Sequence, residues 1–261
     1  MIQPPSPPTR VDILGTSIAT TSYAEVLAAI GRPPADRAQL FAFCNVHSVM
    51  TARRDHDVRV ALDLMDFASP DGMPLVWVLR RRWHPSQPRV YGPDLMELAL
   101  PDGVDLGWQH FFVGTTDETL DRLTDSARRL APGVRIVGRY APPYRPMTAS
   151  EEDDVIERIR SSGANVVWVG LGMPKQELWM HRVRERLPGI SLLGVGAAFD
   201  LLSGTVPQAP DWLQNRGLEW AYRLWREPRR LWRRYLINNP SFIVLATAET
   251  LRYRFKSGRH G

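Results

Sequence analysis

Short apolar runs alternate with longer stretches of helical periodicity along most of the chain. The apolar runs predict strands at residues 11–14, 40–44, 67–68, 110–113, 135–137, 166–169 and 191–194. Between them, apolar positions recur with the period of a helix at residues 46–65, 73–83, 118–130, 151–161 and 174–187. Strands separated by helices require crossover connections, so the sequence predicts an α/β fold: a Rossmann-like, mostly parallel sheet flanked by helices.

The chain divides into three segments. Residues 1–10 are rich in proline and lack an apolar period, which predicts a disordered tail. Residues 11–215 contain every predicted strand and form the α/β body. Two Pro-rich loops interrupt the body at 32–39 and 141–149, and the second is a candidate flap over a binding site. Residues 216–261 predict helices alone, which makes them a helical appendage.

Within the appendage, residues 229–236 predict an amphipathic helix. Pro228 suits the first turn of this helix, and Asn239-Pro240 predicts its end. In a helix with 100° per residue, one side holds four arginines: Arg229, Arg230, Arg233 and Arg234. The opposite side holds four apolar or aromatic residues: Leu231, Trp232, Tyr235 and Leu236. Such a helix either packs on a domain with a solvated face or lies on a membrane.

Composition excludes several classes of protein. The apolar fraction of 44% and the charged fraction of 23% are typical of globular chains. No apolar run approaches the roughly 18 residues that cross a bilayer, and the amino terminus does not resemble a signal peptide. The single cysteine, Cys44, excludes a disulfide framework and a cysteine-built zinc site. These features favour the cytoplasm.

Positive charge is concentrated in the appendage. The whole chain has a net charge of +5, and 31 of its 33 basic residues are arginine. Residues 216–261 contain eleven basic and three acidic side chains, a net charge of +8, so the first 215 residues carry −3. A local excess of charge indicates a local anionic partner, which is a nucleic acid, an anionic membrane face or a phosphate-bearing substrate.

A glycine-rich turn follows the predicted strand at 166–169. Gly170 and Gly172 allow the backbone to approach a ligand, and Lys175 and Gln176 open the next helix, where free N–H groups favour phosphate. The alternative is an ordinary tight turn between strand and helix. The spacing lacks the third glycine of a dinucleotide fingerprint, and Phe199 stands where a second such motif needs a small residue. We therefore expect no nicotinamide chemistry and no cofactor.

Asp71 comes directly after a predicted strand and before a helix. Its structural role would be the N-cap of that helix. Its functional role would be a general base at the carboxyl end of a parallel strand, where open α/β sheets bind ligands. Asp94 allows the same two interpretations, and Arg89 is either a surface charge or a clamp for phosphate.

The sequence predicts no metal site. Asp55 and Asp57 form an Asp-x-Asp pattern, but they fall inside the predicted helix at 46–65, where residues two apart point in different directions. We interpret them as solvated helix surface. The acidic run 151–154 fits the first turn of a helix, and the six histidines lack the His-Glu-x-x-His spacing of zinc enzymes.

Nine short motifs occur in order over about residues 11–243. They are Cys44-Asn45-Val46-His47, Pro70-Asp71-Gly72-Met73, Arg89-Val90-Tyr91-Gly92-Pro93-Asp94, Phe111-Phe112-Val113-Gly114, Gly170-Leu171-Gly172-Met173-Pro174-Lys175-Gln176-Glu177, Gly194-Val195-Gly196-Ala197-Ala198-Phe199-Asp200, Gln208-Ala209-Pro210, Gly217-Leu218-Glu219-Trp220 and Glu227-Pro228-Arg229-Arg230. In this order the motifs resemble the WecG/TagA/CpsF glycosyltransferases, the inverting glycosyltransferase family 26. The chain departs from that family at Phe43, where members often carry threonine, and at Gln208, where they usually carry arginine.

The resemblance implies a metal-independent glycosyltransferase of cell-surface polysaccharide synthesis. Its substrates would be a UDP-sugar, of the N-acetylmannosamine type or a hexose, and a polyprenyl-diphosphate-linked sugar acceptor at the inner face of the plasma membrane. The resemblance puts the catalytic base at Asp71, with Asn45 and Arg89 beside it. From the resemblance and the turns above, we expect substrate to be bound by Gly72, Asp94, Gly114, Gly170, Gly172, Lys175, Gln176, Arg230 and Arg233.

Under this hypothesis the appendage folds over the body and its arginines help to hold the departing diphosphate. Two other classes of function stay open. A nucleic-acid-binding protein that uses the basic tail predicts salt-sensitive binding to generic oligonucleotides, but gives the glycine-rich turns no role. A nucleotide-sugar epimerase needs a nicotinamide fingerprint that the sequence lacks. Homo-oligomerisation also stays open.

Overall fold

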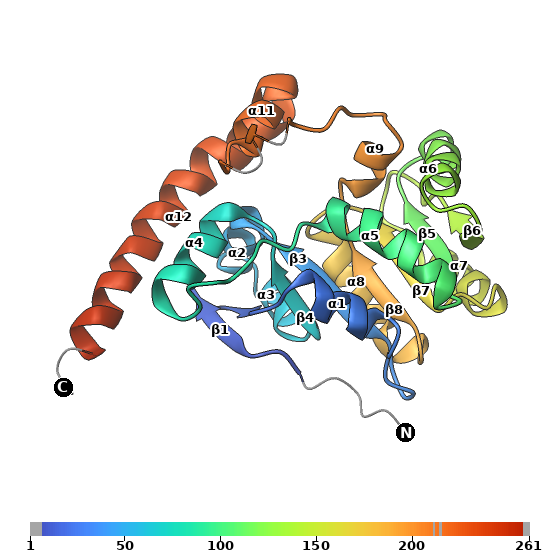
Figure 1. Cartoon of the computed structure of the whole chain (residues 1–261), viewed down its shortest axis with the longest axis horizontal. Coiled ribbons are helices and arrows are strands. Elements are labelled where there is room, and N and C mark those ends of the chain that lie inside the picture. Colours follow the sequence, from blue (N-terminus) through green and yellow to red (C-terminus); the bar gives the residue numbers. More distant parts are fainter. Residues whose placement is uncertain (1–6, 211, 214–215, 258–261) are drawn as a thin grey trace.

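A six-stranded parallel sheet forms the centre of the molecule (Figure 1). The computed structural model describes residues 7–210, 212–213 and 216–257, without the side chains at 230, 233, 234 and 252–257. The strand order is β4-β3-β8-β7-β5-β6. The strands are β3 (Gln39–Cys44), β4 (Phe67–Pro70), β5 (Gln109–Gly114), β6 (Arg135–Tyr140), β7 (Val166–Gly170) and β8 (Ser191–Gly194). Because the strands are parallel, their carboxyl ends all meet at one edge of the sheet.

Helices cover both faces of the sheet because its strands carry apolar side chains on both sides. In β3, Phe41 and Phe43 belong to the core on one face, whereas Leu40, Ala42 and Cys44 belong to the core on the other. The first face packs against α1 (Tyr23–Ile30), α5 (Gly92–Asp105), α6 (Asp117–Leu130) and α9 (Ala198–Leu202). The second packs against α2 (Val46–Ala52), α3 (His56–Asp63), α4 (Met73–Arg82), α7 (Ala149–Ser161) and α8 (Lys175–Val183). The predicted fold class is confirmed.

The region predicted as one helix at 46–65 is two helices. After α2 the chain turns at residues 53–55, and Asp55 becomes the N-cap of α3, with its carboxylate accepting the N–H groups of Asp57 and Val58 at 3.0 and 3.2 Å. The prediction was wrong because an aspartate that caps a new helix leaves the apolar period on both sides almost undisturbed. Asp55 and Asp57 are both exposed. Similarly, the helix predicted at 174–187 gives way after α8 to a 3₁₀ turn, η1 (Arg184–Arg186).

A short antiparallel hairpin precedes the sheet. It pairs β1 (Arg10–Ile13) with β2 (Thr16–Ala19), and the sequence pattern predicted only the first of these strands. The turn between them places Leu14 and Gly15 at φ values of 55° and 83°. Two successive positive φ angles are the geometry of a tight hairpin turn, which is uncommon with leucine in the first position and therefore gives no sequence signal.

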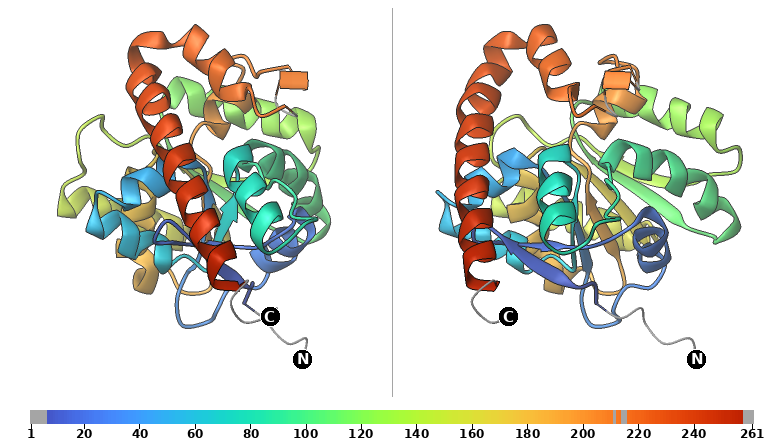
Figure 2. Two further views of the ribbon diagram at one scale, coloured as in Figure 1. Left: turned by 90° about the vertical axis from the view of Figure 1, so that its left-hand side faces the viewer. Right: turned by 60° about the vertical axis from the view of Figure 1, so that its left-hand side comes forward.

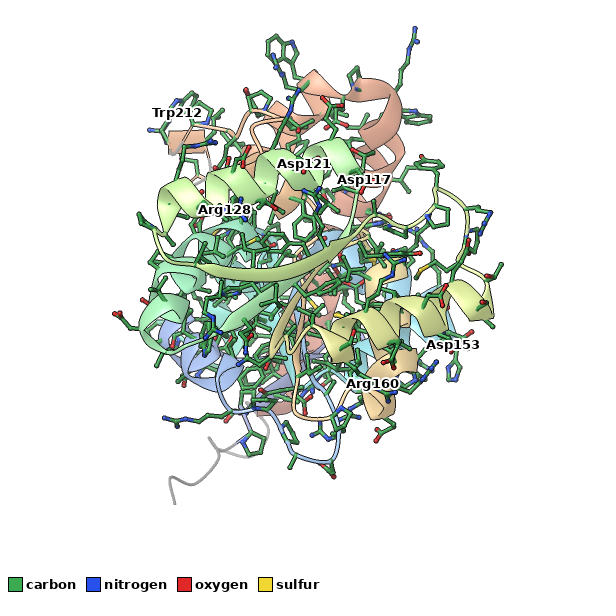
Figure 3. All side chains as sticks on the ribbon, turned by 90° about the vertical axis from the view of Figure 1, so that its right-hand side faces the viewer. Asp117, Asp121, Arg128, Asp153, Arg160 and Trp212 are labelled. Atoms are coloured by element: carbon green, nitrogen blue, oxygen red, sulfur yellow. The ribbon has the colours of Figure 1, made fainter. Side chains whose placement is uncertain are left out.

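Charged side chains cover the outer faces of α6 and α7, at the side of the molecule opposite α12. Figure 3 shows Asp117, Asp121 and Arg128 along α6, and Asp153 and Arg160 on α7, pointing to solvent. The acidic run at 151–154 lies in the beginning of α7, where Glu151 forms a capping box with Thr148. The run lies at the beginning of a helix, as predicted, with Glu151 and Glu152 in the first turn.

The carboxyl-terminal segment folds against the body as two helices. A short α11 (Glu219–Arg226) is followed by the long α12 (Pro228–Ser257), which runs down one side of the molecule (Figures 1 and 2). α12 does not end at Asn239-Pro240, so that prediction was wrong. A proline inside a helix costs roughly 3 kcal/mol. Packing offsets this cost, because Phe242 and Ala246 are buried in the same core as α2 and α4.

A buried arginine also fixes α12 to the body. The side chain of Arg82, at the end of α4, is 2% exposed and bonds three groups of α12. Its guanidinium donates to Glu249 Oε2 at 2.6 Å, to Thr250 Oγ1 at 2.8 Å and to the carbonyl of Ala246 at 2.9 Å. The far half of α12 is therefore held by polar as well as apolar contacts.

Candidate active site

A cavity of about 100 Å³ lies between the body and the carboxyl-terminal helices. The body contributes the beginning of α2, the turn into α4 and the segment before α5, and the carboxyl-terminal segment contributes α11 and α12. The lining residues are Asn45, Val46, His47, Asp71, Gly72, Met73, Pro74, Arg89, Tyr91, Gly217, Glu219, Trp220, Arg223, Tyr235 and Asn239. The three predicted catalytic residues and Gly72 thus come together from separate parts of the chain.

Asp71 begins the turn that follows β4. Its backbone N–H donates to the carbonyl of Cys44 at 2.8 Å, which ties this turn to the end of the neighbouring strand β3. The N-cap of α4 is Gly72, with no side-chain cap bond, so the Asp71 carboxylate does not cap the helix. Burial raises the pKa of Asp71 to about 6, because the counteracting charge of Arg89 does not make up for the loss of water. A largely buried carboxyl group with such a pKa is suited to accept a proton near neutral pH.

Asn45 occupies the corresponding position after β3. Its side-chain oxygen caps α2 by accepting the N–H groups of His47 and Ser48 at 2.9 and 3.4 Å. The oxygen is thereby used, and the amide N–H₂ is the donor that Asn45 can offer to a ligand. Gly72 packs directly on Asn45, since a Cβ at position 72 would lie 3.0 Å from the Asn45 Cβ.

Arg89 lies between two carboxylates. Its Nη2 donates to Asp71 Oδ1 at 3.2 Å and to Glu219 Oε2 at 2.7 Å, and its Nε donates to the backbone carbonyl of Asp71 at 2.5 Å. The guanidinium also stacks on the ring of Tyr91, 3.9 Å from the ring centroid. The Tyr91 hydroxyl in turn donates to Glu219 Oε1 at 2.8 Å. Arg89 is therefore held by protein groups on several sides rather than extended into solvent.

The chain matches a known protein family over most of its length. Residues 11–256 match the family model described as "Glycosyl transferase WecG/TagA/CpsF family". The match covers nearly the whole chain, including α11 and most of α12. The chain belongs to the WecG/TagA/CpsF family of glycosyltransferases. The resemblance inferred from the nine motifs is confirmed, and the cavity with Asp71 is the candidate active site of a glycosyltransferase.

In this glycosyltransferase, hydrogen bonds from the side chain of Gln176 stabilise the glycine-rich turn after β7. Gln176 is buried, and its Oε1 accepts the Gly172 N–H at 3.2 Å. Its Nε2 donates to Glu177 Oε1 and to the Gly194 carbonyl, both at 2.9 Å. These bonds join the turn after β7 to the end of β8. Gln176 therefore shapes the two turns, and its predicted contact with substrate stays a prediction.

Two of the predicted glycines serve close packing at the same edge of the sheet. A Cβ at Gly170 would lie 2.5 Å from the Phe199 ring, and one at Gly114 would lie 2.7 Å from the Gly170 backbone. Gly172 differs, because its φ of +76° requires a glycine while the space around it is open. Gly172 is therefore required by backbone conformation rather than by close packing.

The remaining predicted binding residues in the described part of the chain do not line the cavity. Lys175 is exposed at the first position of α8, with its Nζ 5.7 Å from the ring centroid of Tyr144 in the 141–149 loop. Asp94 accepts the hydroxyl of Tyr23 at 3.2 Å, and that hydroxyl also accepts the Tyr91 N–H at 3.0 Å. Asp94 thus helps to position the segment that carries Arg89. The side chains of Arg230 and Arg233 lie outside the described residues.

Sequence reasoning missed several cavity residues, above all Glu219. It lies in the Gly217-Leu218-Glu219-Trp220 motif and is one of only three acidic residues in a strongly basic segment, which was the available signal. Arg223, one turn further along α11, also lines the cavity, and among the described residues its Nε has no hydrogen-bond partner. Tyr235 on α12 contacts Trp220 on α11, with ring centroids 5.9 Å apart.

The described residues contain no cluster of three or more His, Cys, Asp or Glu side chains that could hold a metal ion. No helix in this part of the chain is long and apolar enough to cross a bilayer.

Proposed function

We propose that this glycosyltransferase transfers a hexose or an N-acetylhexosamine, such as N-acetylmannosamine, from a UDP-sugar to a polyprenyl-diphosphate-linked acceptor. The transfer inverts the anomeric centre and builds a cell-surface polysaccharide. The family match supports a nucleotide-sugar donor and a lipid-linked acceptor in general. The observation that carries the mechanism is the Asp71 carboxylate just after the carboxyl end of β4, in a cavity that Asn45 and Arg89 also line.

In the proposed mechanism Asp71 is the general base. It takes the proton from the attacking hydroxyl of the acceptor as the new bond to the anomeric carbon forms and the bond to the diphosphate breaks. A positioned base of this kind contributes roughly 10²–10⁴ in rate. Asn45 lines the same cavity, and its amide N–H₂ is suited to hold an oxygen of either sugar.

The departing diphosphate needs positive charge and N–H donors. Arg223 supports this role, since it lines the cavity and has an unpaired Nε–H among the described residues. Lys175, which is exposed at the first position of α8, is a further candidate, because the N-terminus of a helix favours negative charge. Arg230 and Arg233 are also proposed to bind the departing diphosphate, because the sequence places them on the arginine-rich side of the predicted helix at 229–236.

The appendage, residues 216–261, is proposed to close the site at the membrane. The cavity is lined by residues of the body and of the carboxyl-terminal helices, so α11 and α12 form one wall of the site. α12 presents exposed apolar side chains at Trp232, Leu236, Ile243, Val244 and Leu251, and the segment 216–261 carries a net charge of +8. This combination suits an anionic membrane surface, which would place the protein peripherally on the inner face of the plasma membrane.

The transfer proposal is tested by product analysis with a panel of UDP-sugars and a polyprenyl-diphosphate-linked acceptor. We expect turnover in the presence of a metal chelator and a loss of at least 100-fold in Asp71→Asn. Asp57→Asn is the matched control, because it removes an exposed carboxylate from the Asp-x-Asp pattern. Full activity of Asp71→Asn, or equal losses in both variants, would contradict the role of Asp71. Sedimentation with anionic and neutral vesicles tests the membrane proposal, which fails if binding is absent from both.

A further inference from the structure

Glu219 and Asp71 compete for one guanidinium. The Arg89 Nη2 lies 2.7 Å from Glu219 Oε2 but 3.2 Å from Asp71 Oδ1. The shorter distance is that of a full charge-assisted hydrogen bond, whereas the longer one is a weakened contact. Arg89 therefore neutralises Glu219 more effectively than it neutralises Asp71.

Both oxygens of Glu219 are bonded to the body. Oε2 accepts from Arg89, and Oε1 accepts from the Tyr91 hydroxyl at 2.8 Å. These two partners belong to the same short segment before α5, which is itself fixed by the Tyr23 hydroxyl and by the bond from the Val90 N–H to the Pro70 carbonyl at 2.9 Å. Glu219 is thus the direct polar link between α11 and the loop that carries Arg89.

We propose that Glu219 is a positioning residue that controls the catalytic base: by drawing the Arg89 guanidinium away from the Asp71 carboxylate, it makes Asp71 a proton acceptor only when α11 is docked. This inference rests on the proposed role of Asp71. When α11 moves away from the body, Arg89 loses Glu219 and its Nη2 keeps only the Asp71 carboxylate as a partner. The Arg89–Asp71 pair then becomes tighter, and a tightly paired carboxylate is a weaker base. Docking of the appendage and activation of the base are then one event.

The charges of Arg89 and Glu219 shift the pKa of Asp71 in the directions that the geometry predicts. Burial is the largest influence on the pKa of Asp71; Arg89 lowers this pKa, whereas Glu219 raises it. Removal of the Glu219 charge and a tighter Arg89–Asp71 pair both act in the same direction, toward a lower pKa. The other titratable or charged groups around Asp71 are Tyr23 on α1, Cys44 at the end of β3, His47 on α2, Tyr91 before α5, Arg223 on α11 and Tyr235 on α12.

The test is a direct titration of Asp71 in the full-length protein. Protein labelled with ¹³C at the aspartate carboxyl carbons is titrated by NMR, and the Asp71 signal is assigned by its absence from Asp71→Asn. We expect a midpoint near pH 6 in the wild type and a clear downward displacement in Glu219→Gln, toward the ordinary aspartate value of 3.8. Glu219→Asp, which keeps the charge, should stay closer to the wild type than Glu219→Gln does. An unchanged or higher midpoint in Glu219→Gln overturns the proposal.

Glu249→Gln is the matched control. Glu249 is another acidic residue of the carboxyl-terminal segment, paired with an arginine of the body at 2.6 Å, but it is not among the residues that line the cavity. We expect the Asp71 midpoint to be unaltered in this variant, and an equal displacement in both variants would mean that any weakening of the appendage suffices. Tyr91→Phe provides a second test, because it removes one Glu219 partner without changing a charge at pH 7, and it should lower the midpoint by less.

Activity separates this inference from the proposed function. At pH 7 we expect Glu219→Gln to lower kcat roughly tenfold, part of the 10²–10⁴ that a positioned base supplies. The KM for the UDP-sugar should change less than threefold, since Glu219 is not proposed to touch the donor. If Asp71→Asn is fully active while the midpoint still falls in Glu219→Gln, the role of Asp71 fails and the charge coupling stands. If the midpoint does not move, the coupling fails whatever the activity.

Discussion

Truncating a side chain to alanine should affect the stability of the protein very differently on the two faces of α12. Phe242 is 2% exposed in the core shared with α2 and α4, whereas its neighbour Ile243 is 60% exposed. Replacing a buried phenylalanine by alanine removes its transfer free energy and leaves a cavity, at a cost of roughly 3–5 kcal/mol. Replacing an exposed side chain changes the free energy of unfolding by about 0.5 kcal/mol or less.

Urea unfolding followed by tryptophan fluorescence distinguishes the two variants. We expect Phe242→Ala to lose at least about 3 kcal/mol, which at roughly 2–4 °C per kcal/mol lowers Tm by about 10 °C. Ile243→Ala should unfold like the wild type but bind anionic vesicles more weakly. Equal stability of Phe242→Ala and Ile243→Ala would refute the packing of α12 on the body and, with it, the explanation of why the helix continues past Pro240.

Three further predictions concern the active site and its glycine turns. The kcat/KM should fall as the pH drops through about 6, where Asp71 takes up a proton, and a profile that stays flat to pH 5 would exclude Asp71 as the base. The pKa of Asp71 is higher in the folded state than the ordinary 3.8, so the folded protein binds this proton more tightly and its stability declines as the pH rises through about 6. Asp71→Asn should therefore be more stable than the wild type at pH 7.5, by on the order of 2 kcal/mol in urea unfolding. This difference in the free energy of unfolding should shrink by pH 5. Gly170→Ala should lower the free energy of unfolding by about 1–3 kcal/mol, because its Cβ would lie 2.5 Å from the Phe199 ring. Gly172→Ala should lower it by about 1–2 kcal/mol through backbone strain, because position 172 has a φ of +76° although the space around it is open. Thermal unfolding that leaves Gly170→Ala unchanged would contradict the packing against Phe199.

Local pattern and family resemblance together located the body half of the site: Asp71 and Arg89 were candidates by local pattern, whereas Asn45 came from the resemblance alone. Asn45 and Asp71 each follow directly after a buried strand, and the parallel arrangement of β3 and β4 brings such positions together without further information. The strand-to-helix alternation likewise predicted the sheet and most of its helices. These features depend on residues that are neighbours in sequence or on the general geometry of parallel sheets.

The other half of the site depends on where the carboxyl-terminal helices dock. Glu219 meets Arg89 across 130 positions of sequence, and by local pattern it is only an acidic residue at the start of an amphipathic helix. The continuation of α12 past Pro240 has the same origin, because the burial of Phe242 and the bonds of Arg82 override a local stop signal. Contacts that are set by tertiary packing leave no periodic trace in the sequence.

The only thiol in the chain lies beneath the turn that carries Asp71. Cys44 is 1% exposed, and burial raises the pKa of its thiol far above the usual range, so it resists alkylating reagents while the core is closed. A cysteine introduced at an exposed position of α12, such as Ile243→Cys, would then be the single site for a maleimide dye, with the unmodified protein as the blank. A fluorophore at this position can report when α12 enters a lipid surface, and no native cysteine has to be removed first.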